Sequence, residues 1–201
     1  FRQEVDEMAG RSVLDEAIAG SGRLGDLHHE LMDLEHAMGD PEHPGFEAAL
    51  ERFGHVQEEY QHLGGYELEA KAKACLHGLG FTNEQIEGDV GALSGGWKMR
   101  VSMAKVLLGG FDVLLMDEPT NHLDIESILW LEQYLKAVPA TLLMTSHDRD
   151  FMNRIVTKVL EIDGGEVTTY GGNYDFYTRE RDLREANQEA AYERQQAKLA
   201  K

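Results

Sequence analysis

The spacing of apolar residues divides the chain into a helical first part and a second part in which strands and helices alternate. From residue 24 to residue 63, apolar side chains recur every three or four positions in two stripes, which a stretch with Pro and Gly at 40–45 separates. The apolar positions are Leu24, Leu27, Leu31, Leu34, Met38, Phe46, Ala49, Leu50, Phe53, Val56, Tyr60 and Leu63. This pattern predicts two amphipathic helices that pack on each other as an αα-hairpin.

Two further helices are predicted on either side of this hairpin. Residues 4–19 and 66–79 carry apolar side chains at helical spacing. Thr82, followed by Gln85 three residues later, predicts a capping box that opens a further short turn. The first 92 residues are therefore expected to be helical.

Two short apolar runs without alternation predict neighbouring strands of a parallel sheet. They are Val113–Met116 and Thr141–Thr145, and a helical pattern at 124–137 lies between them. The first run is expected to be buried on both faces of the sheet. A strand, a crossover helix and a second strand form a βαβ unit, and ligands bind beyond the carboxyl ends of such strands.

Polar residues follow both runs. Asp117 and Glu118 come directly after the first strand, and His147 follows the second. An acidic pair in this position can hold a divalent metal ion and orient water for attack on a phosphate. The alternative is a solvated acidic turn closed by Pro119, which a lone Asp-Glu-Pro would favour. The placement of His147 at the same edge of the sheet favours the catalytic interpretation.

A glycine pair opens a predicted helix that runs to about Leu108. Ser94 is expected to cap this helix, and Gly95 and Gly96 expose backbone N–H groups in its first turn. Unpaired N–H donors and the helix dipole make such an end an anion site suited to a phosphate. An ordinary helix cap has the same pattern, so both interpretations stand at this point.

The last part of the chain predicts a β-hairpin and a long polar helix. Residues 156–162 and 167–170 are strand-like runs joined by a turn that contains two glycines. Residues 175–201 form a continuous polar segment with few apolar positions. This helix is expected to project from the domain, or to lead towards a missing segment, rather than to join the core.

Composition limits the classes of function. The formal net charge is −18, and residues 1–92 hold 20 acidic against 6 basic residues, which argues against a general affinity for nucleic-acid backbones. No apolar run reaches 18 residues, so no membrane span is expected. The single cysteine, Cys75, fits a reducing, cytoplasmic setting. The histidines of the helical part lack the paired spacing of a metal site and are expected on the surface.

Together these motifs resemble the nucleotide-binding domain of an ATP-binding cassette (ABC) protein. Leu93–Gly96 is similar to the family's signature motif, and Leu114–Glu118 to its Walker B strand. Asn121–Asp124 resembles the D-loop and Ser146–Asp148 the H-switch, while Gln3 stands where the family has its Q-loop glutamine. The resemblance implies an α/β fold. It combines a P-loop NTPase-like ABC ATPase core, with a partial parallel sheet and flanking helices, and an α-helical subdomain that contains the αα-hairpin.

Three features resemble the ABC-F branch. Trp97 follows Ser-Gly-Gly where transporter subunits usually carry Gln, and residues 117–124 have the Asp-Glu-Pro-Thr-Asn-His-Leu-Asp form typical of ABC-F proteins. Tyr170–Tyr174, before a charged helix, resembles the exit from the first ABC-F cassette into its linker. The domains that the resemblance implies are an arm-bearing helical subdomain at 1–92, part of the ATPase core at 93–172, and the start of a helical interdomain linker at 173–201.

The resemblance implies ATP and Mg²⁺ as cofactors and a role for each residue near the reacting phosphate. Asp117 is expected to hold Mg²⁺, with Gln3 sensing the metal and the nucleophile. Glu118 is expected to polarise the attacking water, and His147 to contact the γ-phosphate. These roles define an ATP hydrolase.

The remaining candidate residues are implied to act with a partner. Ser94, Gly95 and Gly96 are expected to cap an ATP held by a second ABC cassette, head to tail and in the same polypeptide, with Asp124 coupling the two sites. ABC-F proteins lack membrane domains, and many act on ribosomes near the tRNA sites, so a ribosome or tRNA partner is expected. One alternative is the nucleotide-binding subunit of an ABC membrane transporter, and a second, without enzyme activity, is an interaction or scaffold piece.

One motif of the family does not occur in the 201 residues. They contain no Gly-x-x-x-x-Gly-Lys-Ser/Thr stretch, which the family has before its Q-loop glutamine and hence before Phe1. The chain is therefore expected to be the later part of a first cassette without this phosphate-binding loop. Since that loop supplies most of the grip on the β- and γ-phosphates, the chain alone is expected to bind ATP weakly and to hydrolyse it negligibly.

Overall fold

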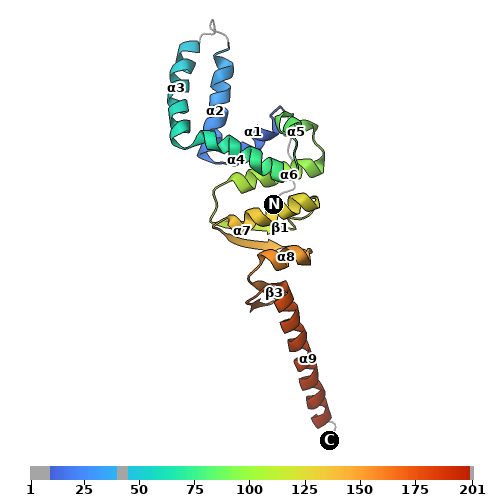
Figure 1. Cartoon of the computed structure of the whole chain (residues 1–201). Helices are drawn as coiled ribbons and strands as arrows, with labels where there is room; N and C mark the ends of the chain where they lie inside the picture. The colour runs from blue at the N-terminus through green and yellow to red at the C-terminus, as the bar shows by residue number, and fades with distance from the viewer. Residues whose placement is uncertain (1–9, 40–44, 200–201) are drawn as a thin grey trace. The chain divides into compact units, whose positions relative to one another are not determined.

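The computed structural model describes residues 10–39 and 45–199, in which the chain forms two compact units. The first unit contains the chain up to Leu114 together with 121–131 and 139–142. The second contains 115–120, 132–138 and the chain from Leu143 onward. Figure 1 shows the helices and strands along the chain.

The first unit begins with a run of helices. They are α1 (Val13–Ile18), α2 (Arg23–Ala37), α3 (Phe46–His62), α4 (Gly65–Gly78), α5 (Asn83–Glu87), the 3-10 turn η1 (Val90–Ala92) and α6 (Gly95–Leu108). The predicted αα-hairpin is confirmed as α2 and α3, which pack side by side (Figure 1). The capping box of Thr82 and Gln85 is also confirmed, because both of its hydrogen bonds are present at the start of α5.

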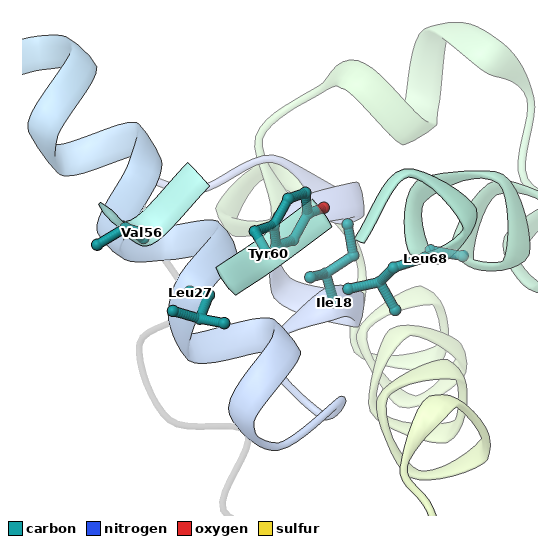
Figure 2. Close-up of a cluster of buried hydrophobic side chains, with 6 residues drawn as sticks. Ile18, Leu27, Val56, Tyr60 and Leu68 are labelled. Carbon is teal, nitrogen blue, oxygen red and sulfur yellow. The ribbon is translucent and has the colours of Figure 1, made fainter. Parts of the chain in front are cut away.

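A cluster of buried side chains anchors the root of the α2–α3 hairpin against α1 and α4. Its members are Ile18, Leu27, Val56, Tyr60, Leu68 and Ala72 (Figure 2). Gly65 opens α4 directly against this cluster, because a Cβ there would lie 2.3 Å from the Tyr60 ring. Full burial of one large aliphatic side chain contributes about 1.5–3 kcal/mol, so a few such residues hold the root of the hairpin firmly.

His28 does not lie on the surface, as was predicted for the histidines of the helical part. Its side chain is only 11% exposed. Nε2 of His28 lies 3.2 Å from Asp15 Oδ1, and Nδ1 lies 3.3 Å from the Tyr60 hydroxyl. The prediction is wrong at this position because two polar partners, one from α1 and one from α3, satisfy a ring that the packing of the helices encloses.

The predicted βαβ unit is confirmed. It consists of β1 (Val113–Asp117), α7 (Ile125–Ala137) and β2 (Thr141–Thr145), and the two strands are neighbours. The Thr141 amide donates to the Asp112 carbonyl at 2.9 Å, and the Glu118 amide donates to the Thr145 carbonyl at 3.0 Å. Since the bonded positions advance together along both strands, the strands run parallel.

The expectation that β1 is buried on both faces is wrong for the described part of the chain. Leu114 is 4% exposed, whereas Val113 and Leu115 are 57% and 63% exposed. Side chains alternate between the faces of a strand, so residues 113, 115 and 117 share one face. The non-alternating apolar run is therefore half buried, since described residues cover only the face of Leu114.

The rest of the second unit is a helix, a β-hairpin and a long helix. These elements are α8 (Arg149–Ile155), β3 (Val159–Asp163), β4 (Glu166–Tyr170) and α9 (Tyr174–Leu199). β3 and β4 are antiparallel, with Val159 opposite Tyr170 and Asp163 opposite Glu166. Two glycines with positive φ, 56° and 85°, form the turn, as predicted.

The base of α9 is fixed to this hairpin by one carboxylate. Glu161 of β3 accepts hydrogen bonds from the hydroxyls of Tyr170 and Tyr177, at 3.0 and 2.9 Å, and from Arg184 at 2.5 Å. The Tyr170 and Tyr177 rings also pack edge to face, 5.0 Å apart. Beyond this contact α9 is a polar helix, and no helix in the described part of the chain is long and apolar enough to cross a membrane.

Candidate functional site

The carboxyl ends of β1 and β2 bring three polar residues together in the second unit. The Thr145 hydroxyl donates a short hydrogen bond to Asp117 Oδ1. The Glu118 amide donates to the Thr145 carbonyl at 3.0 Å. The last residue of β2 therefore fixes both the side chain at the end of β1 and the backbone of the residue that follows it.

Glu118 has an unusual backbone conformation. Its φ of 48° lies in the left-handed region, which costs a residue other than glycine about 1–3 kcal/mol. The His147 amide donates to Glu118 Oε2 at 3.0 Å, and His147 Nε2 lies 3.5 Å from Oε1. The Glu118 side chain is 23% exposed, whereas the His147 side chain is 97% exposed. The carboxylate is thus held by backbone, while the imidazole stands in solvent.

Asp117 fits a divalent cation such as Mg²⁺. It is exposed, and within the described ranges no hydrogen bond is made by its second carboxylate oxygen. Carboxylate oxygen is a hard ligand that suits Mg²⁺, an ion that typically takes one or two carboxylates and completes its shell with water and phosphate oxygens. Among the described residues, no group of three or more His, Cys, Asp or Glu could enclose a metal ion. Asp117 would therefore be one ligand of an otherwise non-protein shell.

The start of α6 presents open backbone. Gly95 and Gly96 begin the helix, and a Cβ on either residue would meet no atom within 4 Å. Ser94 is the N-cap residue of α6, as predicted, with the extended backbone of a cap, although its hydroxyl makes no cap hydrogen bond. Among the residues that the structure describes, the Ser94 hydroxyl and the amides of Gly95 and Gly96 have no hydrogen-bond partner, and the start of a 14-residue helix with open donors is suited to an anion.

Asp124 has structural partners within the first unit. Its Oδ1 accepts from the Ser127 amide at 2.9 Å, which caps α7, and its Oδ2 accepts from Arg100 Nη1 at 2.9 Å. The Ser127 hydrogen bond and then the Arg100 hydrogen bond lower the pKa of Asp124 to about 2. Asp124 is therefore ionised near neutral pH and tied to α6.

The candidate residues fall into separate groups. Asp117, Glu118 and His147 lie in the second unit, whereas Ser94–Gly96 and Asp124 lie in the first. Gln3 lies outside the described residues.

Two residues of these groups were not singled out from the sequence. Thr145 holds Asp117, and Arg100 holds Asp124. Thr145 could have been found from the parallel register, because the last residue of β2 lies beside the last residue of β1. Arg100 has no comparable signal, since its partners come from two distant segments.

Comparisons with known proteins define the class of this chain. Two sequence models described as ABC transporter match it, one at residues 9–121 and the other at residues 160–201. The first match covers more than half of the 201 residues. The chain therefore belongs to the ABC transporter family, and with it the predicted ABC ATPase fold class is confirmed.

The similar proteins include a member of the F branch. "Probable ATP-binding protein YheS" of Escherichia coli (strain K12) is 45% identical over 138 residues, which are 69% of this chain and 22% of that protein. "ABC transporter F family member 3" of Arabidopsis thaliana is 40% identical over 143 residues, which are 71% of this chain and 20% of that protein. The prediction of an ABC-F nucleotide-binding domain is confirmed. This chain spans about a fifth of the length of these two relatives.

One solved structure is similar over about half of its chain. It is a dimeric post-hydrolysis state of an ATP-binding cassette bound to ADP and Pi. The match covers 53% of this chain and 48% of that chain, with 25% identity and a TM-score of 0.44.

Proposed function

We propose that the whole protein is an ABC-F ATPase that binds and hydrolyses ATP with Mg²⁺. The observation that carries the proposal is the grouping of Asp117, Glu118 and His147 at the ends of two parallel strands. The family match and the ATP-binding and F-family names of the relatives support it.

The two carboxylates have different tasks in this proposal. Bound Mg²⁺ neutralises negative charge on the phosphate oxygens as the γ-phosphate is transferred. Asp117, held by Thr145, would supply an oxygen ligand for this ion. Glu118 orients the attacking water and accepts its proton. The solvent-exposed imidazole of His147 is free to contact the γ-phosphate.

The proposal extends to partners. A second cassette would hold an ATP that the start of α6 covers, since Ser94, Gly95 and Gly96 lie at its first turn, where a Cβ on either glycine would meet no atom within 4 Å. Asp124 would couple the two ATP sites. The resemblance to ABC-F proteins supports a cytoplasmic role at the ribosome, near the tRNA sites. Because the first 92 residues are acidic, a general attraction to phosphate would not be the basis of their contact with the ribosome.

Glu118→Gln in the whole protein tests the hydrolytic assignment. The amide keeps the shape of the side chain but cannot accept a proton, so ATP binding should be retained while turnover falls at least about 100-fold, or about 2.7 kcal/mol. Steady-state hydrolysis and equilibrium binding of ATP measure the two effects. Glu126→Gln, which changes an exposed carboxylate on α7, is the matched control and should hydrolyse ATP normally. A Glu118→Gln rate within about threefold of wild type would contradict the assignment.

A second candidate is the nucleotide-binding subunit of a membrane transporter, which the family's own description favours. The Glu118→Gln protein distinguishes the two, because it should accumulate in its ATP-bound closed state. Sedimentation with ribosomes in the presence of ATP supports the ABC-F proposal. Recovery with a membrane permease in detergent supports the transporter subunit.

A further inference from the structure

Arg100 of α6 holds the D-loop, the segment Asn121–Asp124, by direct hydrogen bonds. Its side chain is only 11% exposed. Nε and Nη2 both donate to the His122 carbonyl, at 3.0 and 2.8 Å. Nη1 donates to Asp124 Oδ2 at 2.9 Å. The fork of the guanidinium thus holds one backbone oxygen and one carboxylate of the same short segment.

The segment that Arg100 holds is strained. His122 has a φ of 67°, in the left-handed region, at a cost of about 1–3 kcal/mol. Such a conformation persists only where the surroundings fix it. The paired bonds to the His122 carbonyl act on that peptide directly, so Arg100 is the side chain that fixes this turn of the D-loop.

The guanidinium is itself held from the other side. Nη1 also donates to the Leu79 carbonyl at 2.8 Å, just beyond α4. Gly80 leaves room for it, because a Cβ there would lie 2.8 Å from Nη1, and its φ of 91° favours glycine. The Trp97 ring lies 4.5 Å from the guanidinium carbon and packs on Phe81, with ring centroids 4.8 Å apart. Arg100 is therefore fixed between the end of α4 and the D-loop.

We propose that Arg100 is a positioning residue for ATP hydrolysis, which fixes the D-loop to α6 so that the two move as one body. The inference rests on the proposed function, in which Ser94–Gly96 and Asp124 serve the same pair of ATP sites. Residues that act on one interface must keep their spacing while the cassettes close. Lys cannot replace Arg100, since a single ammonium group cannot hold the carbonyl in a fork and reach the other acceptors.

Amide hydrogen exchange of the full chain tests the local part of this inference without ATP. In Arg100→Gln, the amides of Ser127 and Ile128 should exchange at least about tenfold faster, because Asp124, which accepts from both, loses its anchor. The α6 amides should keep their protection. Asp124→Asn, which weakens the same pair from the other side, should raise exchange at the same two amides. Unchanged exchange at residues 127 and 128 in both variants would overturn the proposal.

ATP turnover of the whole protein tests the functional part. Arg100→Gln and Arg100→Lys should lower kcat, expressed per folded molecule, at least about tenfold and change KM less than about threefold. Circular dichroism of each variant gives the folded fraction, so that a loss of active molecules is not counted as a loss of kcat. Arg52→Gln, which removes an exposed arginine paired with Glu30, is the matched control and should leave kcat unchanged. Faster exchange with a normal kcat would show a purely structural arginine and overturn the proposal. Absence of turnover in the wild type would instead refute the proposed function, and the exchange result would remain valid.

Discussion

The hairpin root and the strand-end site each contain a carboxylate and a histidine, but they differ in how far these side chains are buried and hydrogen-bonded. At the root, Asp15, His28 and Tyr60 bond one another inside packed helices. The His28 side chain is 11% exposed, and its hydrogen bond lowers the pKa of Asp15 despite the opposing effect of burial. At the strand ends, Glu118 is held by the backbone of His147, whose imidazole is 97% exposed.

The difference shows what distinguishes a structural polar network from a candidate reactive one. At the root, the hydrogen bonds join three helices and leave little capacity for a ligand. At the strand ends, the bonds orient each carboxylate from one side and leave its other oxygen or its neighbouring ring open. Changes at the root should therefore alter stability, whereas changes at the strand ends should alter activity.

The largest effect is expected from removing apolar volume at the root. Leu27 is fully buried, so Leu27→Ala should lower the free energy of unfolding by about 2–5 kcal/mol through lost burial and a residual cavity. Chemical denaturation of the full chain measures this change. Leu50→Ala, at a position on α3 that is 53% exposed, should cost well under half as much. Equal losses in the two variants would show that Leu27 contributes no more to stability than Leu50. That result would refute a hairpin that is tightly packed at its root and solvent-exposed further out.

An intermediate effect, on activity alone, is expected at the strand ends. Thr145→Val keeps the shape of the side chain but removes the donor to Asp117. Turnover by the whole protein should fall about tenfold, or about 1.4 kcal/mol, with a higher Mg²⁺ requirement, and the unfolding transition should be unchanged. Thr141→Val, at an exposed position at the start of the same strand, is the control. A large loss of stability with normal turnover would place Thr145 with the structural residues.

The smallest effect is expected from the charge at the root. The folded pKa of Asp15 lies below its ordinary 3.8, so the ionised group adds stability at neutral pH that is lost as the pH falls below about 4. Asp15→Asn should cost about 1 kcal/mol at pH 7 and flatten the pH dependence of unfolding below pH 4. Denaturation measured between pH 3 and pH 7 gives both values. If the stability of Asp15→Asn fell as steeply below pH 4 as that of the wild type, other carboxylates would dominate this pH dependence.

The elements could be predicted where the pattern alone defines them. The α2–α3 hairpin, the βαβ unit and the turn between β3 and β4 follow from apolar spacing and from glycine position. β3 begins later than predicted, at Val159, because Val156 serves as the C-cap of α8. Thr145 could have been found from the register of the two parallel strands, whereas the role of Arg100 could not be predicted, since its partners lie more than 20 residues away.

The site could be predicted in part. The polar residues at the strand ends follow from sheet geometry, and the structure brings Glu118 and His147 into contact as expected. The backbone strain at Glu118 and the absence of a side-chain cap hydrogen bond at Ser94 could not be foreseen, because both depend on the tertiary contacts of their loops. The roles of the individual residues and the three domain boundaries stay predictions.

The carboxylate at the base of α9 has a mechanical consequence. This helix has 26 residues and, at about 1.5 Å per residue, is about 39 Å long (Figure 1). Its first turns are clamped by Tyr177 and Arg184 on Glu161, so the helix works as a lever pivoted at one end. The 15 residues beyond Arg184 extend about 22 Å, so a tilt of about 10° at the clamp would displace the far end by about 4 Å. Any rearrangement of the β3–β4 hairpin that tilts Glu161 would therefore move the far end of α9 more than its base.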